Sequence, residues 1–456
     1  MTTNPLNSKE KLWLSKAKRK DINGWIYLSI AGEAYERGFQ HGYLLGNEIA
    51  GALRVIKYLI AFDTGSSFDF FMKNAVEMFP KHIDKEFLDE MHGIAEGSTK
   101  AGYKVSFEEI LTWNAYPELI CNWWPPKGAV GSPSLHLQRH PHRCSAFVAT
   151  GKATKKGDIV MAHTTWQLYG ASDWYNVVLD IYPDKGNPII MQSVPGYIDS
   201  STDFWISGAG LMITETSIVG FSGFDATKSP EFFRSRKATQ YAKTIDQWKD
   251  MMLDNNNGGY ANIWLLGDIN TREIARFELG LKYYGFEKKK EGCYAGYNVP
   301  VDLQLRNLEC SGTGYYDIRS NGARKVRWEQ LFEKHHGKID SKLAKEMIAD
   351  HYDVYTNEEN PCGRTICGHF EKDNAADGAG SPPYYPWGSA DGKVTDSKMA
   401  KAMAFEGIWG HACGKAFDAD KFLKKNRQYD WLKGYMKNRP SQPWTKFSVL
   451  SEKSKK

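Results

Sequence analysis

The sequence predicts an α+β protein in which helices and strands occur in separate runs. Residues 1–120 show mainly the apolar spacing of helices, and the middle of the chain alternates short apolar runs with Gly and Asp/Asn turns. Helical patterns return after residue 229. Segregated runs of this kind are typical of layered α+β domains. No period of about 20 to 50 residues recurs, which argues against solenoids and propellers.

Local signals place the helices. Apolar residues recur at helical spacing over 32–62, and Ser106-Phe107-Glu108-Glu109 forms a capping box that opens a helix through Trp113. Further helices are predicted over 229–241, after Thr244, and over 323–335 and 341–352.

Strands are predicted from the middle of the chain. Residues 145–150 and 159–163 flank the turn sequence Lys155-Lys156-Gly157-Asp158, which indicates a β-hairpin. Cys144 stands at the start of its first strand. The other predicted strands are 174–182, 188–193, 204–207, 210–217, 261–268 and 273–279.

The 456-residue chain carries 59 basic and 54 acidic residues, a net charge of +5 with no long basic block, so no nucleic-acid partner is expected. No apolar run approaches the ~20 residues of a membrane span, and no signal-peptide core follows the lysine-rich opening over 9–20. We therefore expect no transmembrane segment. The protein is then either cytoplasmic or lacks its targeting segment here.

Composition changes sharply between residues 125 and 143, where Pro, Gly, Ser and His dominate. Such a stretch reads as an exposed connector. It divides the chain into a helical segment, 1–143, and a second segment, 144–456. A cut at the end of the connector would make Cys144 a chain terminus.

An N-terminal cysteine carries its own general base, because a free α-amine titrates near ~7.7–8.0 and lies within reach of the thiol. This is the chemistry of an N-terminal-nucleophile hydrolase. The alternative is that Cys144 is a small buried hydrophobe, as free cysteines on strands often are.

Several ordered motifs resemble the phospholipase B-like (laminin-ancestor) family. They are the hairpin over 144–166, Gln192-Ser193-Val194-Pro195-Gly196 with Asp203-Phe204, Gly208-Ala209-Gly210-Leu211 leading to Thr214-Glu215-Thr216, and Asn256-Asn257-Gly258-Gly259-Tyr260-Ala261-Asn262-Ile263-Trp264. Glu36-Arg37-Gly38-Phe39-Gln40-His41-Gly42 also resembles the propeptide of that family and of the acyl-coenzyme A:6-aminopenicillanate acyltransferases. Both groups, like choloylglycine hydrolases, are cysteine N-terminal-nucleophile hydrolases.

The resemblance implies a four-layered αββα fold with a helical N-terminal prosegment, and self-cleavage before Cys144. It also implies that an asparagine amide stabilises the oxyanion. Asn257 is the first candidate, by its match to the choloylglycine hydrolase asparagine, and Asn262 is the second. From the residues alone, Asn-Gly-Gly is a turn.

The same resemblance suggests four supporting residues. His163 and Trp166 stand where relatives place hairpin residues facing the nucleophile, and Thr216 is a hydrogen-bonding partner near it. Arg324 resembles an arginine that favours the thiolate. Without the family, His163 and Trp166 are structural residues, and Arg324 is a surface residue of a first helical turn.

Two clusters suggest metal or redox chemistry. His136, His140, His142 and Cys144 could hold zinc, but the segment lacks a second ligand pair. The second cluster comprises Cys362, Cys367, His369, His411 and Cys413. Here a buried thiol pair is expected, or a disulfide if the protein is exported. We expect no cofactor.

The sequence thus predicts a self-processed cysteine hydrolase that cleaves an N-acyl amide or acyl-ester bond of a small-molecule or lipid substrate. The cleaved fragments are expected to stay associated, because the helices of the first segment have apolar faces. By family resemblance the setting is secreted or lysosomal. The alternative is a non-catalytic lipid- or glycan-binding protein on the same fold.

Overall fold

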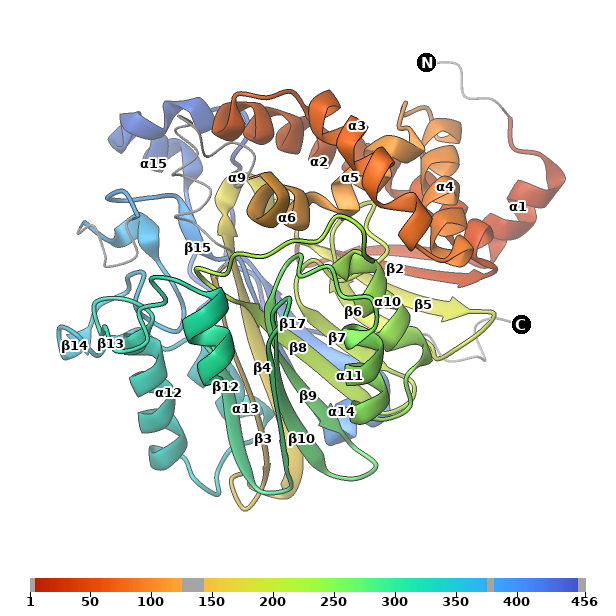
Figure 1. Ribbon diagram of the computed structural model, residues 1–456. Coiled ribbons are helices and arrows are strands. Elements are labelled where there is room, and N and C mark those ends of the chain that lie inside the picture. Colours follow the sequence, from red (N-terminus) through yellow and green to blue (C-terminus); the bar gives the residue numbers. More distant parts are fainter. Residues whose placement is uncertain (1–4, 125–142, 375–380, 450–456) are drawn as a thin grey trace.

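A computed structural model describes residues 5–124, 143–374 and 381–449, and its core consists of two stacked sheets (Figure 1). The larger sheet has nine strands in the order β1-β2-β5-β6-β7-β8-β9-β10-β11. Only β2 and β5 run parallel in it, and the other neighbours are antiparallel. Its strands are β1 (Lys18–Ile22), β2 (Trp25–Gly32), β5 (Val177–Pro183), β6 (Ile189–Ser193), β7 (Phe204–Ser207), β8 (Leu211–Ser217), β9 (Asn262–Asp268), β10 (Glu273–Leu279) and β11 (Tyr284–Lys289).

The second sheet contains the hairpin that begins at Cys144. Its order is β12-β3-β4-β16-β17-β18, with β15 paired to the far end of β4. All its described pairs are antiparallel. The strands are β12 (Gly292–Gly296), β3 (Arg143–Gly151), β4 (Gly157–Leu168), β15 (Trp387–Ser389), β16 (Asp391–Asp396), β17 (Ala404–Trp409) and β18 (Thr445–Ser448); a separate small ribbon pairs β13 (Tyr352–Asp353) with β14 (Glu358–Glu359).

Helices cover the outer face of each sheet. One apolar core packs the N-terminal helices and α10–α11 on the nine-stranded sheet, a second fills the space between the sheets, and a third packs α12–α13 on the second sheet. The longer helices are α1 (Ser8–Ser15), α2 (Ala34–Thr64), α3 (Phe68–Met78), α4 (Lys85–Lys100), α5 (Phe107–Asn114), α10 (Glu231–Tyr241), α11 (Ile245–Leu253), α12 (Gly322–Lys334) and α13 (Ser341–Ile348). The short ones are α6 (Tyr116–Glu118), α9 (Tyr169–Ser172), α14 (Ser397–Lys401) and α15 (Ala419–Lys425). The layers are therefore αββα, which confirms the predicted fold class.

Close approach of α2 and α4 depends on glycine. A Cβ on Gly38 or Gly42 would collide with backbone atoms of Glu90 and Ile94 on α4, and Gly93 and Gly97 meet α2 in the same way. Side chains at these positions would push the two helices apart, because packed interiors leave no room for extra atoms.

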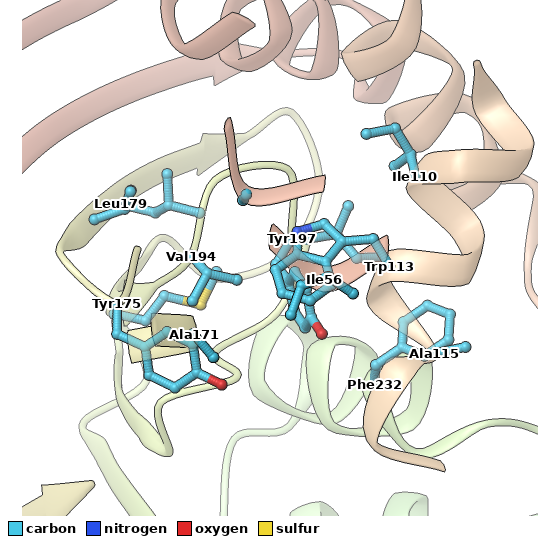
Figure 2. Packing of buried hydrophobic residues seen from close by; sticks show 14 of the residues in the cluster. Ile56, Ile110, Trp113, Ala115, Ala171, Tyr175, Leu179, Val194, Tyr197 and Phe232 are labelled. Atoms are coloured by element: carbon cyan, nitrogen blue, oxygen red, sulfur yellow. The ribbon is translucent and has the colours of Figure 1, made fainter. Parts of the chain in front are cut away.

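The first segment is tied to the sandwich at several points. Trp113 of α5 packs edge-to-face on Tyr197, with ring centroids 4.8 Å apart, and its indole N–H donates to the Pro195 carbonyl at 2.8 Å (Figure 2). Val194 and Phe232 belong to the same core. The first segment thus buries apolar surface against the second, as its amphipathic helices predicted.

The N-terminal segment is mostly helical, as expected, but it also supplies β1 and β2 to the nine-stranded sheet. The sequence prediction missed these two strands. In the predicted regions, the capping box at Ser106 is formed in both directions, and β7 and β10 have the predicted bounds. No helix in the described ranges is long and apolar enough to cross a membrane.

Candidate active site

Cys144 is the second residue of β3, and its side chain points between the two sheets. Side chains alternate along a strand, so Cys144 shares its face with Ala146 and Val148, which belong to the core between the sheets. Cys144 is fully buried. Its register partner on β4 is Thr165, and Ala146 pairs with His163, so His163 lies on the same face as the thiol.

Two side chains lie close to the Cys144 thiol: His163, which was expected there, and Asp203, which was not. The Cys144 thiol donates to Oδ2 of Asp203 at 3.7 Å, and Nε2 of His163 lies 4.0 Å from the same oxygen. The sulfur, a ring nitrogen and the carboxylate oxygen all lie within 4.8 Å of one another. Asp203 adopts a left-handed backbone conformation, with φ of 67°, at the start of β7. Asp203 belongs to the Asp203-Phe204 motif, but no role was predicted for it.

Burial sets the protonation states. It raises the pKa of the Cys144 thiol well above the ordinary value, and the negative charges of Asp203 and Glu215 raise it further. Burial raises the pKa of Asp203 to about 7, against lowering by Glu215 and Lys393. Burial likewise lowers the pKa of His163 well below its usual range. Near neutrality the thiol and the imidazole are therefore neutral. Asp203 is mainly a carboxylate above about pH 7, where it can accept the thiol proton.

The backbone of Cys144 is fixed on both sides. Its N–H donates to Oδ1 of Asn298 at 3.1 Å, and its carbonyl accepts from Arg324 at 2.5 Å. Arg324 also donates to Oδ1 of Asn298 at 2.9 Å. Asn298 was not predicted, because no motif singled out in the sequence includes it.

Arg324 was expected to favour the thiolate, and that role stays a prediction. Its hydrogen bonds include those to the carbonyl of Cys144 and to Oδ1 of Asn298. Its guanidinium carbon lies 4.5 Å from the ring centre of Trp166. Arg324 therefore positions the strand end.

The side chain of Trp166 does not face the Cys144 thiol. It is three residues from His163 and pairs with Arg143, so it projects from the opposite face of β4. There it packs edge-to-face on Phe370, at a centroid distance of 5.9 Å, and under the Arg324 guanidinium. The expectation that Trp166 faces Cys144 is therefore wrong. Trp166 instead packs against the guanidinium of Arg324.

The predicted asparagines differ in what they contact. Asn257 is buried, but its amide donates to Glu118 at 2.5 Å and its oxygen accepts from Gly259 N–H. Asn262 begins β9 and is also buried, and neither its amide nitrogen nor its oxygen has a hydrogen-bond partner among the described residues. Asn262 therefore has the uncommitted amide that Asn257 lacks.

Asn262, Thr216 and Asn298 are neighbours across two strands. Asn262 pairs with Ser217 on β8, and the Ser217 carbonyl accepts from Asn298 Nδ2 at 2.7 Å. The hydroxyl of Thr216 accepts from the Asn298 N–H at 3.4 Å. Thr216 thus contacts Asn298, whose Oδ1 accepts from the Cys144 N–H.

Next to Asp203 lies a cavity of about 10 Å³, roughly the space of one water molecule. The first segment contributes Asn114, Pro117 and Glu118 to its wall. Burial raises the pKa of Glu118 to about 7. As the described residues line it, this cavity is too small to hold a substrate.

The zinc hypothesis for the connector falls partly outside the described residues. His136, His140 and His142 lie in the undescribed range 125–142. In the described ranges, Cys144 instead groups with His163 and Asp203.

The architecture first defines a class of protein. An αββα sandwich of two sheets, with a cysteine at the start of a central hairpin, is the arrangement expected of an N-terminal-nucleophile hydrolase. The family model for phospholipase B matches residues 75–279. A relative named phospholipase B, from Crotalus adamanteus, is 25% identical over 62% of this chain and 54% of its own length. An uncharacterized protein of Archaeoglobus fulgidus is 26% identical over 55% of this chain and 42% of its own.

The chain is thus similar to phospholipase B proteins over part of its length, as its motifs predicted. It spans about half the length of the curated relatives it matches. Among solved structures, penicillin V acylase from Agrobacterium tumefaciens aligns with a TM-score of 0.32 at 12% identity, covering 58% of this chain and 83% of the acylase.

Proposed function

We propose that this chain is a self-processing cysteine N-terminal-nucleophile hydrolase that cleaves linear amide or acyl-ester bonds, with Cys144 as the nucleophile. The observation that carries the proposal is the grouping of the Cys144 thiol, His163 and Asp203 within 4.8 Å, on a cysteine whose backbone N–H and carbonyl are each held by a buried side chain. A buried structural cysteine needs neither a carboxylate partner nor fixed peptide groups.

The first step is cleavage of the Arg143–Cys144 peptide bond. Asp203 takes the thiol proton, the sulfur attacks the Arg143 carbonyl carbon, and the C–N bond breaks as the proton passes to the Cys144 nitrogen. Water then hydrolyses the thioester, which releases the Arg143 carboxylate and restores the thiol. Asn298 holds the nitrogen throughout, so the new α-amine forms where the peptide N–H was.

In the mature protein the α-amine becomes the general base beside the sulfur. It accepts the thiol proton as the sulfur attacks the acyl carbon, and it returns that proton to the leaving amine or alcohol. The uncommitted amide of Asn262 donates to the oxyanion, and water completes the turnover by hydrolysing the acyl-cysteine.

The two segments, 1–143 and 144–456, stay associated after the cut. β2 remains paired with β5, Asn114 bonds the backbone of Gly196 and Ile198, and His41 accepts from the Gly196 N–H at 3.0 Å. These contacts support the loop between β6 and β7 that leads to Asp203. The first segment is therefore part of the mature site.

The test of the activity uses processed wild-type protein and Cys144→Ala, each incubated with N-acyl amides and with phospholipids. Acyl release by the wild type alone, with a mass increase of one acyl group on the peptide that begins with Cys144 after acid quenching, supports the proposal. Binding of these compounds by both proteins without acyl release would instead favour a lipid-binding protein on the same fold.

A further inference from the structure

Four side chains able to bind a metal converge beside β15, where His369 forms a β-bridge with Gly388. They are His351, Cys367, His369 and Cys413, whose ligand atoms all lie within 4.8 Å of one another. His351 precedes β13, Cys367 and His369 lie in the loop after β14, and Cys413 follows β17. Segments far apart in the sequence thus meet through side chains that can all bind a transition metal.

The distances between these ligand atoms fit a tetrahedral metal centre. Sγ of Cys367 lies 3.4 Å from Nε2 of His369, and Sγ of Cys413 lies 3.6 Å from the same nitrogen. Zinc bonds sulfur at about 2.3 Å and imidazole nitrogen at about 2.05 Å, so tetrahedral ligands are about 3.5 Å apart. The set of two thiols and two imidazoles is also one that selects zinc over hard cations.

The second ring nitrogen of His369 has the partner expected behind a metal ligand. Nδ1 of His369 lies 2.8 Å from Oε1 of Glu371, and the other Glu371 oxygen accepts from the Tyr169 hydroxyl at 2.7 Å. A carboxylate on Nδ1 fixes the imidazole so that Nε2 points its lone pair at the metal. All three side chains are buried.

An unpartnered nitrogen at the cluster also favours a cation. Nε2 of His351 is buried and makes no hydrogen bond in the described part of the chain. A buried imidazole nitrogen without a partner is costly, and a bound metal ion would supply one.

Two neighbouring residues are excluded as ligands by their own contacts. Cys362 turns its thiol to Asp353, at 3.5 Å. His411 bonds the Lys415 carbonyl through Nδ1 and the Tyr169 hydroxyl through Nε2. Of the three cysteines in this cluster, Cys367 and Cys413 are therefore the two that can form the expected thiol pair. All seven cysteines are free thiols in the structure.

We propose that His351, Cys367, His369 and Cys413 bind one structural Zn²⁺ with four protein ligands. Each ligand gives up its proton, if it has one, and forms one bond to the metal, so no oxidant or reductant is required. The site joins the loop of the small ribbon to the end of β17. Gly368, between two ligands, packs on Trp166, which in turn lies under Arg324.

The test is the metal content of the full chain, purified without a metal-affinity tag and under reducing conditions. Wild type and Cys362→Ser are expected to contain about one zinc per chain, whereas Cys367→Ser and Cys413→Ser lose most of it. Cys362→Ser is the matched control, because it removes a buried thiol from the same loop. Replacement of zinc by Co²⁺ should give the intense visible bands of a tetrahedral thiolate site in wild type and in the control only.

Other outcomes overturn the proposal. Wild type that takes up no zinc or Co²⁺ after reduction contradicts it, as does a Cys367–Cys413 disulfide found by peptide mapping of protein purified without reductant. If the ligand variants do not fold, wild type still decides. Cys367 and Cys413 should resist alkylation until a chelator is added. Equal rates of alkylation with and without the chelator would refute the metal site.

Discussion

Replacement of Asp203 by Asn should stabilise the fold at high pH while it stops self-cleavage. Asn has the shape of Asp, and it tolerates the left-handed backbone at this position. Burial raises the pKa of Asp203 from 3.8 to about 7, so the folded state binds this proton more tightly than the unfolded state does. This group therefore costs no stability below about pH 4, and its cost grows up to about pH 7 and is constant above it.

The size of the effect follows from the shift. A difference of about 3 pKa units corresponds to an upper limit of about 4 kcal/mol, at about 1.4 kcal/mol per unit. In a Cys144→Ala background, which prevents cleavage, Asp203→Asn should raise the free energy of unfolding by about 2 to 4 kcal/mol at pH ~8 and by almost nothing at pH ~4. The assay is urea unfolding followed by tryptophan fluorescence.

A second buried aspartate provides the control. Asp173 forms an ion pair with Arg439 at 2.8 Å, so Asp173→Asn leaves a buried charge unpaired and should destabilise the fold by about 3 to 5 kcal/mol at pH ~8. With Cys144 intact, Asp203→Asn should show no cleavage at pH ~8. Stability that falls at pH ~8, or a variant that still cleaves at the wild-type rate, would refute the role given to Asp203.

The remaining predictions concern positioning, oxyanion stabilisation and packing. Arg324→Lys loses the guanidinium fork that holds the Cys144 carbonyl with one nitrogen and Asn298 with the other, and it should slow self-cleavage at least ~10-fold with unchanged far-UV circular dichroism. An unchanged rate would contradict this. Asn262→Ala should lower kcat for acyl release by about 10²- to 10³-fold with little change in KM, and an effect on KM alone would count against an oxyanion role. Gly42→Ala, whose Cβ meets the Ile94 carbonyl, should cost at least about 1 to 3 kcal/mol by thermal unfolding in the uncleaved background. An unchanged melting temperature would mean that α2 and α4 are not packed this closely.

Local sequence signals predicted the parts of the fold that depend on neighbouring residues. The Ser106 capping box, the hairpin after Cys144 and the strands β7 and β10 rest on caps, turns and apolar runs within a few residues. The second sheet was largely missed, because β16 carries Asp391 and Lys393. Both are fully buried as an ion pair at 2.8 Å, which only the tertiary fold can satisfy.

The candidate site divides in the same way. Cys144 and His163 lie on facing strands of a predicted hairpin, so the sequence could place them together. Asp203 and Asn298 reach Cys144 from loops distant in the sequence, and no pattern around them marks a role. The choice between Asn257 and Asn262 depends on Glu118 of the first segment. Glu118 accepts a hydrogen bond from the Asn257 amide, and this contact cannot be read from the sequence.

The most direct test of the central claim is intact mass with N-terminal sequencing of purified wild type and Cys144→Ala, each incubated from about pH 4 to about pH 8. We predict that wild type yields two associated fragments, the larger of which begins at Cys144, and that Cys144→Ala stays whole. A wild type that remains intact at every pH, or a Cys144→Ala variant cut at the same bond, would contradict self-cleavage by Cys144.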